Sequence, residues 1–367
     1  MHAAQSGSSL IVAGTRPSAA RWQRYVRPDQ LYRQARVVGL VRQTDSAISV
    51  TLAPMDGQPC DALAGQYLTL IAEIDGRRIK RAYSLSQPAG GKTFTITCKE
   101  IRNGEMSFHI NRHLKEGDLL QFAGPSGDFV IPDPAPAHSV FVAAGSGITP
   151  VMAMLEQLLE HDRCALPVTL VYGNRREKDI LFRSRLDALA ERHPQLSIRY
   201  VLSKPTKNWQ GEQGRVDVSM LPVLSGGHYF LCGPDSFNND LRDGLLQQGI
   251  PPTAISIEHF TGSTGESRPH PTEPHPVLFR LPDGSEQEVT VRPGESILEA
   301  GLRGSVPLQF SCTMGGCGHC KITVESGDVA TDEPNCLSES ERQAGQSLAC
   351  CARPHGRAVV QLPGAVL

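Results

Sequence analysis

Three cysteines lie within nine residues near the C-terminal end of the chain, a density typical of metal ligands. Cys312, Cys317 and Cys320 follow the pattern C-x4-C-x2-C, with three glycines between them. A [2Fe–2S] cluster needs four thiolates, two for each iron, so a fourth cysteine is required downstream. The candidates are Cys336, Cys350 and Cys351. Glycines let such a loop wrap closely and direct backbone N–H groups at the sulfurs.

The surrounding residues 277–367 resemble plant-type ferredoxins. In those proteins an L-x-C sequence at a strand end supplies the fourth ligand, and "SLACCARP" matches it at Cys350. The resemblance therefore implies a cluster on Cys312, Cys317, Cys320 and Cys350, with Cys351 as the substitute if the register is shifted by one. It also implies a β-grasp fold. Residues 277–291 supply two strands joined at Asp283-Gly284, a hairpin signal, and "ESILEAGL" has helical spacing.

Other cysteine sites fit this sequence less well. Structural zinc sites usually contain two C-x2-C pairs, whereas only Cys317 and Cys320 form such a pair here. A Rieske-type site could use Cys317, His319 and Cys336, but it needs a histidine where Glu339 stands. We therefore interpret His319 and Cys336 as residues outside the cluster.

A cluster that carries single electrons needs a source of electrons, and the middle of the chain contains a flavin-type motif. Residues 37–132 contain alternating strand-like runs between Gly, Pro and Asp turns, which predicts an all-β unit. Within it, "RAYSLS" (81–86) resembles the R-x-Y-S signature of the ferredoxin–NADP reductase family. The resemblance implies that Arg81 pairs with the flavin pyrophosphate, that the Tyr83 ring covers the isoalloxazine, and that Ser84 faces flavin N5. Guanidinium and aromatic side chains suit these roles.

A second motif strengthens the flavin assignment. "NGEMSFHINRHL" places Gly104 and Ser107 at the start of a predicted helix, where backbone N–H groups bind phosphate. The same family uses G-x-x-S for the FAD pyrophosphate. Ser107 also suits a plain N-cap, and the two roles are compatible. We assign Ala82, Lys99 and Met106 to the same FAD-binding surface. "GPSGDF" (124–129) matches the turn that precedes the family's second domain.

The next part of the chain, residues 138–260, alternates predicted strands and helices. After the strand "SVFVAAG", residues 145–150 read G-x-G-x-x-P and lead into a helix, an arrangement that cradles a dinucleotide pyrophosphate. The loop departs from G-x-G-x-x-G but resembles the reductase family's G-x-G-x-T-P. The nucleotide-binding residues that this implies are Gly145, Ser146, Gly147, Thr149 and Pro150.

The end of this region contains the residues that the resemblance places beside the nicotinamide. Cys232, Gly233 and Pro234 match the family's C-G-P, although a buried strand-end thiol is the alternative interpretation of Cys232. Glu258 and Phe260 in "ISIEHF" resemble an acidic and an aromatic residue near the contact between flavin and nicotinamide. The candidate catalytic residues are therefore Ser84, Cys232 and Glu258.

Arginines follow the second predicted strand of the nucleotide unit. Arg175 and Arg176 stand at its end and Arg183 lies one turn into the next helix. An arginine here accommodates the ribose 2′-phosphate, whereas a carboxylate favours NADH. We therefore predict NADPH in preference to NADH, with a solvated basic patch as the alternative.

These motifs follow the order of reductases with FAD, nicotinamide and C-terminal [2Fe–2S] modules, such as phenylacetyl-CoA epoxidase reductases and related oxygenase or desaturase reductases. The predicted fold class is multidomain: an antiparallel Greek-key β-barrel, an α/β doubly wound parallel sheet and an α+β β-grasp ferredoxin. The predicted ranges are 1–34 (basic N-terminal extension), 35–134 (FAD-binding barrel), 135–260 (NAD(P)-binding domain), 261–276 (Pro/Gly linker) and 277–367 (ferredoxin domain).

Composition and charge restrict the classes of partner and the cellular compartment that we expect for this protein. The net charge of −2 indicates no nucleic acid or membrane as a bulk partner. No apolar run reaches the ~18 residues of a transmembrane helix. Ten cysteines without a secretory signal predict reduced thiols and a cytoplasmic protein. We expect a monomer.

The implied function is transfer of electrons from NAD(P)H through FAD and the cluster to a separate oxygenase, hydroxylase or desaturase. Residues 277–367 carry seven basic and eleven acidic side chains, which suits docking on a basic partner. One alternative is a self-contained reductase of a quinone or ferric complex, and the retained cluster argues against it. The other is a pure electron-carrier module, and the intact nucleotide motifs argue against it. The arginine-rich residues 16–36 suit peripheral membrane or partner contact, a structural arm, or a targeting segment.

Overall fold

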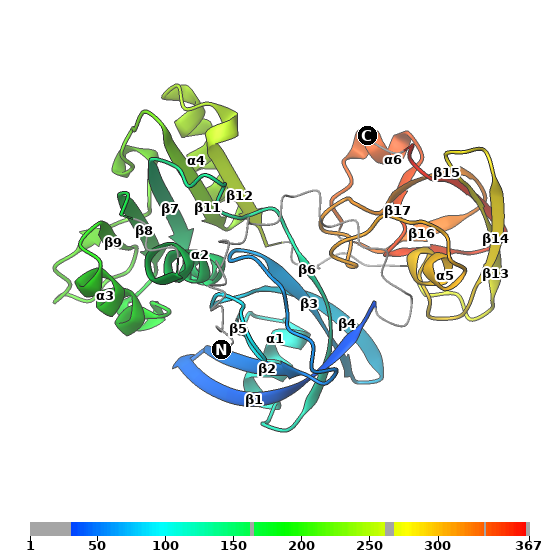
Figure 1. The fold of residues 1–367 in the computed structure, drawn as a ribbon, viewed down its shortest axis with the longest axis horizontal. Coiled ribbons are helices and arrows are strands. Elements are labelled where there is room, and N and C mark those ends of the chain that lie inside the picture. Colours follow the sequence, from blue (N-terminus) through cyan, green and yellow to red (C-terminus); the bar gives the residue numbers. More distant parts are fainter. Residues whose placement is uncertain (1–30, 162–164, 261–267, 334, 365–367) are drawn as a thin grey trace, which may run out of the picture.

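A computed structural model describes residues 31–161, 165–260, 268–333 and 335–364, which form three successive units (Figure 1). A β-barrel comes first, a parallel sheet flanked by helices follows, and a small mixed sheet forms the C-terminal unit. Most of the predicted N-terminal extension and residues 261–267 of the predicted linker lie outside the described residues. The predicted multidomain fold class is confirmed.

The barrel consists of six antiparallel strands and one helix. Its sheet has the order β4-β3-β6-β1-β2-β5, and a bridge between Leu85 and Ile96 connects its two ends. Apolar side chains such as Leu52, Leu70 and Phe122 fill its interior and are fully buried. The elements are β1 (Arg33–Thr44), β2 (Ala47–Pro54), β3 (Tyr67–Ile74), β4 (Arg77–Ser84), β5 (Phe94–Lys99), α1 (Glu105–Arg112) and β6 (Leu119–Ser126).

The second unit is a doubly wound parallel sheet of order β10-β9-β8-β7-β11-β12. Successive strands run outward from β7 on one side and β11 lies on its other side, so the switch point, where such folds bind nucleotides, falls between β7 and β11. The elements are β7 (His138–Ala144), α2 (Ile148–Glu156), β8 (Val168–Asn174), α3 (Arg183–Arg192), β9 (Leu196–Leu202), β10 (Glu212–Gln213), β11 (Gly227–Gly233), α4 (Asp235–Gln247) and β12 (Ile255–His259).

The barrel and the nucleotide unit share part of one hydrophobic core. Ala47 and Ala64 of the barrel are buried in the same cluster as Phe141 and Met152 of the nucleotide unit. This shared core fixes the two cofactor-binding units against each other.

The C-terminal unit is a five-stranded sheet of order β14-β13-β19-β15-β17, with β13 parallel to β19 and its other neighbours antiparallel. The predicted hairpin turn is present, with Gly284 at φ +84°. Helix α5 packs Ile297 and Leu298 into the core. The elements are β13 (His275–Arg280), β14 (Glu286–Val291), α5 (Ile297–Arg303), β15 (Lys321–Ser326), β16 (Val329–Thr331), α6 (Glu339–Gln343), β17 (Gln346–Leu348), β18 (Ala352–Pro354) and β19 (Ala358–Gln361).

The residues just before the barrel connect it with the C-terminal unit. Leu31 is buried in the core of that unit and Tyr32 packs against it, whereas Arg33 and Gln34 already belong to β1. Residues 31–34 were predicted as part of the extension, so the sequence pattern missed this contact. No helix among the described residues is long and apolar enough to cross a membrane.

Candidate functional site

The loop at 312–320 and the turn between β17 and β18 bring the four predicted cluster ligands together. The backbone N–H of Gly315 donates to Cys350 Sγ at 3.2 Å, and that of Gly316 donates to Cys312 Sγ at 3.3 Å. Gly315 has φ +83°, a conformation that glycine adopts without strain. Cys312, Cys320 and Cys350 are buried, and Cys317 is half-buried. The N–H groups thus point at sulfurs, as a thiolate cluster requires.

The thiols also contact one another. The backbone N–H of Cys312 donates to Cys317 Sγ at 3.5 Å, and Cys312 and Cys320 both lie beside Cys350. These contacts with neighbouring thiols lower the pKa of Cys312 and raise that of Cys317. Within the described residues, no group of three or more His, Cys, Asp or Glu side chains is arranged for a metal ion. Each iron of a [2Fe–2S] cluster takes only two protein thiolates, and four buried or half-buried thiols, two of whose sulfurs accept glycine N–H groups, fit this need.

The other sequence candidates lie beside this loop. Cys336 is exposed, and its backbone N–H donates to Gly315 O at 2.9 Å. His319 is exposed as well. Cys351 is buried and contacts Cys350. No glycine N–H among the described residues donates to Cys351 Sγ or Cys336 Sγ, which favours Cys350 as the fourth ligand.

Strand β4 carries the predicted R-x-Y-S residues. Arg81 is partly buried, and its guanidinium donates to the carbonyl of Lys80 at 2.7 Å. It forms no ion pair with any described carboxylate, so it remains available for a phosphate. Tyr83 is half-buried, and burial raises the pKa of its hydroxyl. Ser84 is buried at the strand end.

Helix α1 begins at Glu105, with Gly104 as its N-cap and no side-chain cap. Ser107 is therefore not the N-cap, contrary to that part of the prediction. It is the third helical residue, and its hydroxyl donates to Gly104 O at 2.9 Å while it accepts from Ile101 N at 3.2 Å. Met106 points its side chain into the barrel core. The first N–H groups of α1 lack a side-chain cap, which fits the binding of a pyrophosphate.

The glycine loop of the nucleotide unit forms a 3₁₀ turn over Gly145–Gly147, and α2 follows from Ile148. Pro150 is thus the third residue of α2, and Thr149 Oγ1 donates back to Ser146 O at 3.0 Å. A Cβ on Gly145 would lie 3.7 Å from Lys99 Nζ at the end of β5. The predicted FAD-surface cation therefore lies against the nucleotide loop, where its charge suits a phosphate-bearing ligand.

The C-G-P residues lie directly against this loop. Cys232 is fully buried and pairs in register with Glu258 across β11 and β12. Asn238 of α4 ties the two strands, since its amide donates to Gly233 O at 3.2 Å and to Glu258 O at 3.1 Å. Burial, and then the charge of Asp128, raise the pKa of Glu258 to about 8. This shift favours the protonated form of Glu258 near neutral pH.

The remaining predicted residues lie at the edges of this site. Pro234 is the N-cap of α4. Phe260 follows β12 and is 39% exposed. Ala82 is exposed on β4.

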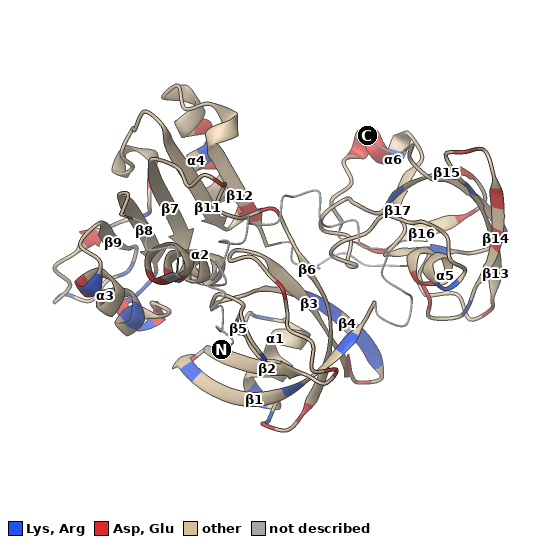
Figure 2. Cartoon of the chain, viewed as in Figure 1, with Lys and Arg blue, Asp and Glu red and all other residues tan. Residues whose placement is uncertain are grey.

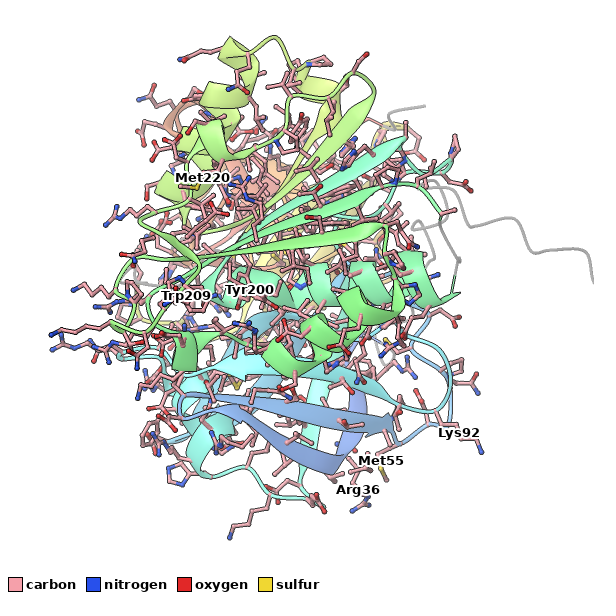
Figure 3. The ribbon with its side chains drawn as sticks, turned by 90° about the vertical axis from the view of Figure 1, so that its left-hand side faces the viewer. Arg36, Met55, Lys92, Tyr200, Trp209 and Met220 are labelled. Atoms are coloured by element: carbon pink, nitrogen blue, oxygen red, sulfur yellow. The ribbon has the colours of Figure 1, made fainter. Side chains whose placement is uncertain are left out.

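The three arginines proposed for the 2′-phosphate differ in their surroundings. Arg175 and Arg176 are exposed and border a cavity of about 270 Å³. They form no ion pair with any described residue. Arg183 is already engaged: its Nε donates to Asp187 at 2.6 Å, and its guanidinium lies 4.1 Å from the ring of Tyr200. Figure 3 shows Tyr200 close to Trp209, whose ring also lies 5.9 Å from Arg183.

Sequence reasoning missed the residues that join the cluster loop to the barrel. Thr69 Oγ1 donates to Cys312 O at 2.6 Å in a buried contact. Tyr67 pairs with Ser84 across β3 and β4, and burial, together with the nearby Cys312 and Cys317 thiols, raises the pKa of its hydroxyl. Neither residue carries a motif. The sequence offered one indirect signal for a contact surface here. Four cations stand close together in "RRIKRAYS", which forms β4, the strand that pairs with β3.

The fold and these sites define an NAD(P)H oxidoreductase of the ferredoxin–NADP reductase type, with FAD and a C-terminal [2Fe–2S] domain. Three family models match in this order: an oxidoreductase FAD-binding domain at 44–131, an oxidoreductase NAD-binding domain at 141–243, and a 2Fe-2S iron-sulfur cluster binding domain at 281–355. The chain belongs to this family.

Relatives match along most of their length. The chain is 31% identical to a subunit of the 1,2-phenylacetyl-CoA epoxidase of Escherichia coli, over 85% of this chain and 92% of that protein. It is also 31% identical to an NADPH oxidoreductase of Mycobacterium tuberculosis, over 81% of this chain and 76% of that protein. The solved structure of phthalate dioxygenase reductase covers 92% of this chain and all (100%) of its own, with 25% identity and a TM-score of 0.63.

Proposed function

We propose that this protein is the reductase component of a two-protein oxygenation system and passes electrons from NAD(P)H to a separate oxygenase, hydroxylase or desaturase. The observation that carries this proposal is the contact between Thr69 of the flavin barrel and Cys312 of the cluster loop. This contact brings the loop that would hold the cluster against the strand pair that carries Ser84, which supports transfer from the flavin to the cluster. Relatives named as reductase components, such as the glycine betaine monooxygenase reductase subunit of Pseudomonas aeruginosa at 26% identity, support the same role.

The chain's own residues supply binding and alignment. FAD, when bound, accepts a hydride from NAD(P)H and releases electrons singly, which suits a one-electron cluster. Arg81 and the start of α1 would hold its pyrophosphate, and Tyr83 would cover its ring. Gly147 keeps the nucleotide loop close to Cys232, and the neutral carboxyl of Glu258 lies on the neighbouring strand.

The acidic character of the ferredoxin domain bears on the partner. Figure 2 shows acidic residues on α6 and β14. Most of these carboxylates have a basic partner, such as Arg280 with Glu286 and Lys321 with Glu341. Among the described residues of 277–364, only Asp283 and Glu339 lack one. The ferredoxin domain therefore presents a modest negative potential to a partner. Such a potential still favours a basic docking surface and an association rate that falls as the salt concentration rises. The membrane or partner role of residues 16–36 stays a prediction.

A comparison of two acceptors tests the proposal. NAD(P)H-driven reduction of cytochrome c, a one-electron protein acceptor, should be lost in the cluster-ligand variant Cys350→Ser, while reduction of ferricyanide by the flavin should continue. If both reactions survive in Cys350→Ser, the cluster is dispensable and the protein is a self-contained reductase. If neither occurs in the native protein, it is an electron-carrier module.

A further inference from the structure

We propose that Tyr32, Arg78, Lys80 and Glu299 form an interdomain latch that docks the ferredoxin domain on the barrel and thereby positions the cluster loop for transfer from the flavin. This inference rests on the flavin-to-cluster path of the proposed function. It concerns a contact between the units, since Glu299 is on α5 and the two cations are on β4.

The latch is built around one carboxylate oxygen. Glu299 Oε1 accepts from Tyr32 Oη at 2.7 Å, from Arg78 at 3.1 Å and from Lys80 Nζ at 3.3 Å. Lys80 Nζ also donates to Tyr32 Oη at 2.7 Å. The Tyr32 ring lies under both cations, 4.4 Å from the Arg78 guanidinium carbon and 4.9 Å from Lys80 Nζ. Three charges and one ring therefore meet at a single point between the two domains.

The latch is shielded from water. The side chains of Lys80 and Glu299 are only 16% and 12% exposed. Burial would raise the pKa of Glu299, but the charge of Lys80 and hydrogen bonds from Ser296 and Tyr32 hold it at about 2. An ion pair in this position persists at salt concentrations that screen exposed pairs, and the loss of one member leaves a buried charge without a partner.

Strand geometry connects the latch to the electron path. Side chains two residues apart on a strand share a face. Lys80, Ala82 and Ser84 therefore project to the same side of β4, and their β3 partners project there as well. Those partners include Tyr67 and Thr69, and Thr69 hydrogen-bonds to Cys312 O. Ser84 of the flavin motif, the Thr69 contact with the cluster loop and the latch thus lie on one face of one strand pair, whereas Arg81 and Tyr83 project from the other face.

The second carboxylate oxygen of Glu299 has a purely local task. Glu299 Oε2 accepts from the backbone N–H of Ser296 at 2.8 Å, which completes a capping box at the start of α5. Glutamine also serves in this capping position. Glu299→Gln therefore removes the charge and keeps the cap, so it separates docking from helix stability.

The test uses the full-length holoprotein and three readouts. Small-angle scattering should show a larger radius of gyration for Glu299→Gln, and hydrogen exchange should increase at β3, β4 and residues 312–317. Stopped-flow reduction by NADPH, or NADH, should show flavin reduction within about twofold of wild type. Cluster reduction should be slower by about tenfold or more, because a small misplacement of reacting groups costs large factors in rate.

Glu341→Gln is the matched control. Glu341 completes the same kind of capping box, with Ser338 at the start of α6, and pairs with Lys321 of its own domain. It should leave all three readouts unchanged. If Glu299→Gln unfolds the domain, Tyr32→Phe removes a single hydroxyl and should give the same changes to a smaller degree.

A double variant tests whether Lys80 and Glu299 act through their contact with each other. Lys80→Met and Glu299→Gln disrupt the same interaction, so the double variant should be no slower than the slower single variant. Fully additive effects, or unchanged scattering and cluster reduction in both single variants, would overturn the latch. Failure of the proposed function would give a different result. In that case NAD(P)H would not reduce the cluster of the native protein, or the reduced native protein would pass no electrons to a protein acceptor.

Discussion

Gly147 of the nucleotide loop lies directly against the backbone of Cys232: a Cβ on Gly147 would stand 2.0 Å from the Cys232 carbonyl oxygen. Real Cβ atoms do not approach backbone so closely, so only glycine allows the loop and the C-G-P strand end to meet. This contact joins two motifs that are 85 residues apart in the chain.

Gly147→Ala should therefore separate the nucleotide loop from β11. We expect kcat/KM for NAD(P)H to fall by about 100-fold, since reacting groups would move by an ångström or more, while FAD stays bound. Steady-state kinetics and flavin absorbance measure both effects. Gly90→Ala is the control, because a Cβ there meets nothing within 4 Å. Equal activity of Gly147→Ala and Gly90→Ala would contradict the tight contact.

Much of the fold could be predicted because local patterns agree with the tertiary structure. The all-β unit predicted over residues 37–132 contains β2 to β6 and most of β1, since strand-like runs are separated there by Gly, Pro and Asp turns. Asp283-Gly284 predicted its hairpin because a tight turn needs a residue with positive φ, which Gly284 has. Such signals depend only on neighbouring residues.

The contacts between units could not be predicted in this way. Thr69 and Cys312 are 243 residues apart, and nothing in either local sequence indicates their hydrogen bond. Glu299 reads from the sequence as part of a helix start, which it is, but its other oxygen faces Lys80 of the barrel. Ser107 suited an N-cap as well as a phosphate site by its residue type, whereas Gly104 is the N-cap. A motif indicates the chemical role of a residue, whereas its contacts with residues far away in the sequence depend on tertiary packing.

Cys350→Ser should abolish or reshape the electron paramagnetic resonance of the dithionite-reduced cluster and lower the bound iron. Cys350 Sγ accepts the Gly315 N–H, which supports its assignment as the fourth ligand. Cys336→Ser should leave spectrum and iron unchanged because Cys336 is exposed beside the loop. A normal spectrum in Cys350→Ser together with its loss in Cys351→Ser would transfer the ligand role to Cys351.

Arg81→Ala should weaken FAD binding by about 10–100-fold, the loss expected for one charge-assisted hydrogen bond to phosphate. Titration of the apoprotein with FAD, followed by flavin fluorescence, measures the change in Kd. Arg36→Ala is the control, because Arg36 is exposed on β1 and, within the described part of the chain, its guanidinium hydrogen-bonds to Gly117 O alone. An unchanged Kd in Arg81→Ala would remove Arg81 from the FAD site.

The preference for NADPH over NADH should depend on Arg175 and Arg176, which form no ion pair with any described residue. We expect native kcat/KM to be higher for NADPH than for NADH. Replacing Arg175 and Arg176 together by Gln should lower the value for NADPH by about 10–100-fold and change that for NADH by less than about threefold. Arg183→Gln should have a smaller effect, because Asp187 and Tyr200 already hold Arg183. A native preference for NADH would refute the prediction.

Glu258 should give flavin reduction a pH dependence centred near 8. Its pKa is raised to about 8 by burial and by Asp128, so the carboxyl is neutral below that pH and negative above it. Oxidation of the nicotinamide creates a positive ring, which a nearby carboxylate stabilises. The stopped-flow rate of flavin reduction should therefore rise as the pH passes through about 8, and Glu258→Gln should abolish this rise.

Titration of Glu258 should also make the stability of the fold fall with rising pH, whereas the rate of flavin reduction rises. Between about pH 5 and 8 the folded state keeps the proton that an unfolded Glu258, with its ordinary pKa, has lost, so stability falls as the pH rises through this range. The melting temperature of Glu258→Gln should accordingly gain on that of wild type from pH 5 to 8. Asp128→Asn provides the internal check: it removes one cause of the raised pKa, so the kinetic step should move to lower pH. A rate profile that is identical in wild type and Glu258→Gln would show that Glu258 does not titrate beside the nicotinamide.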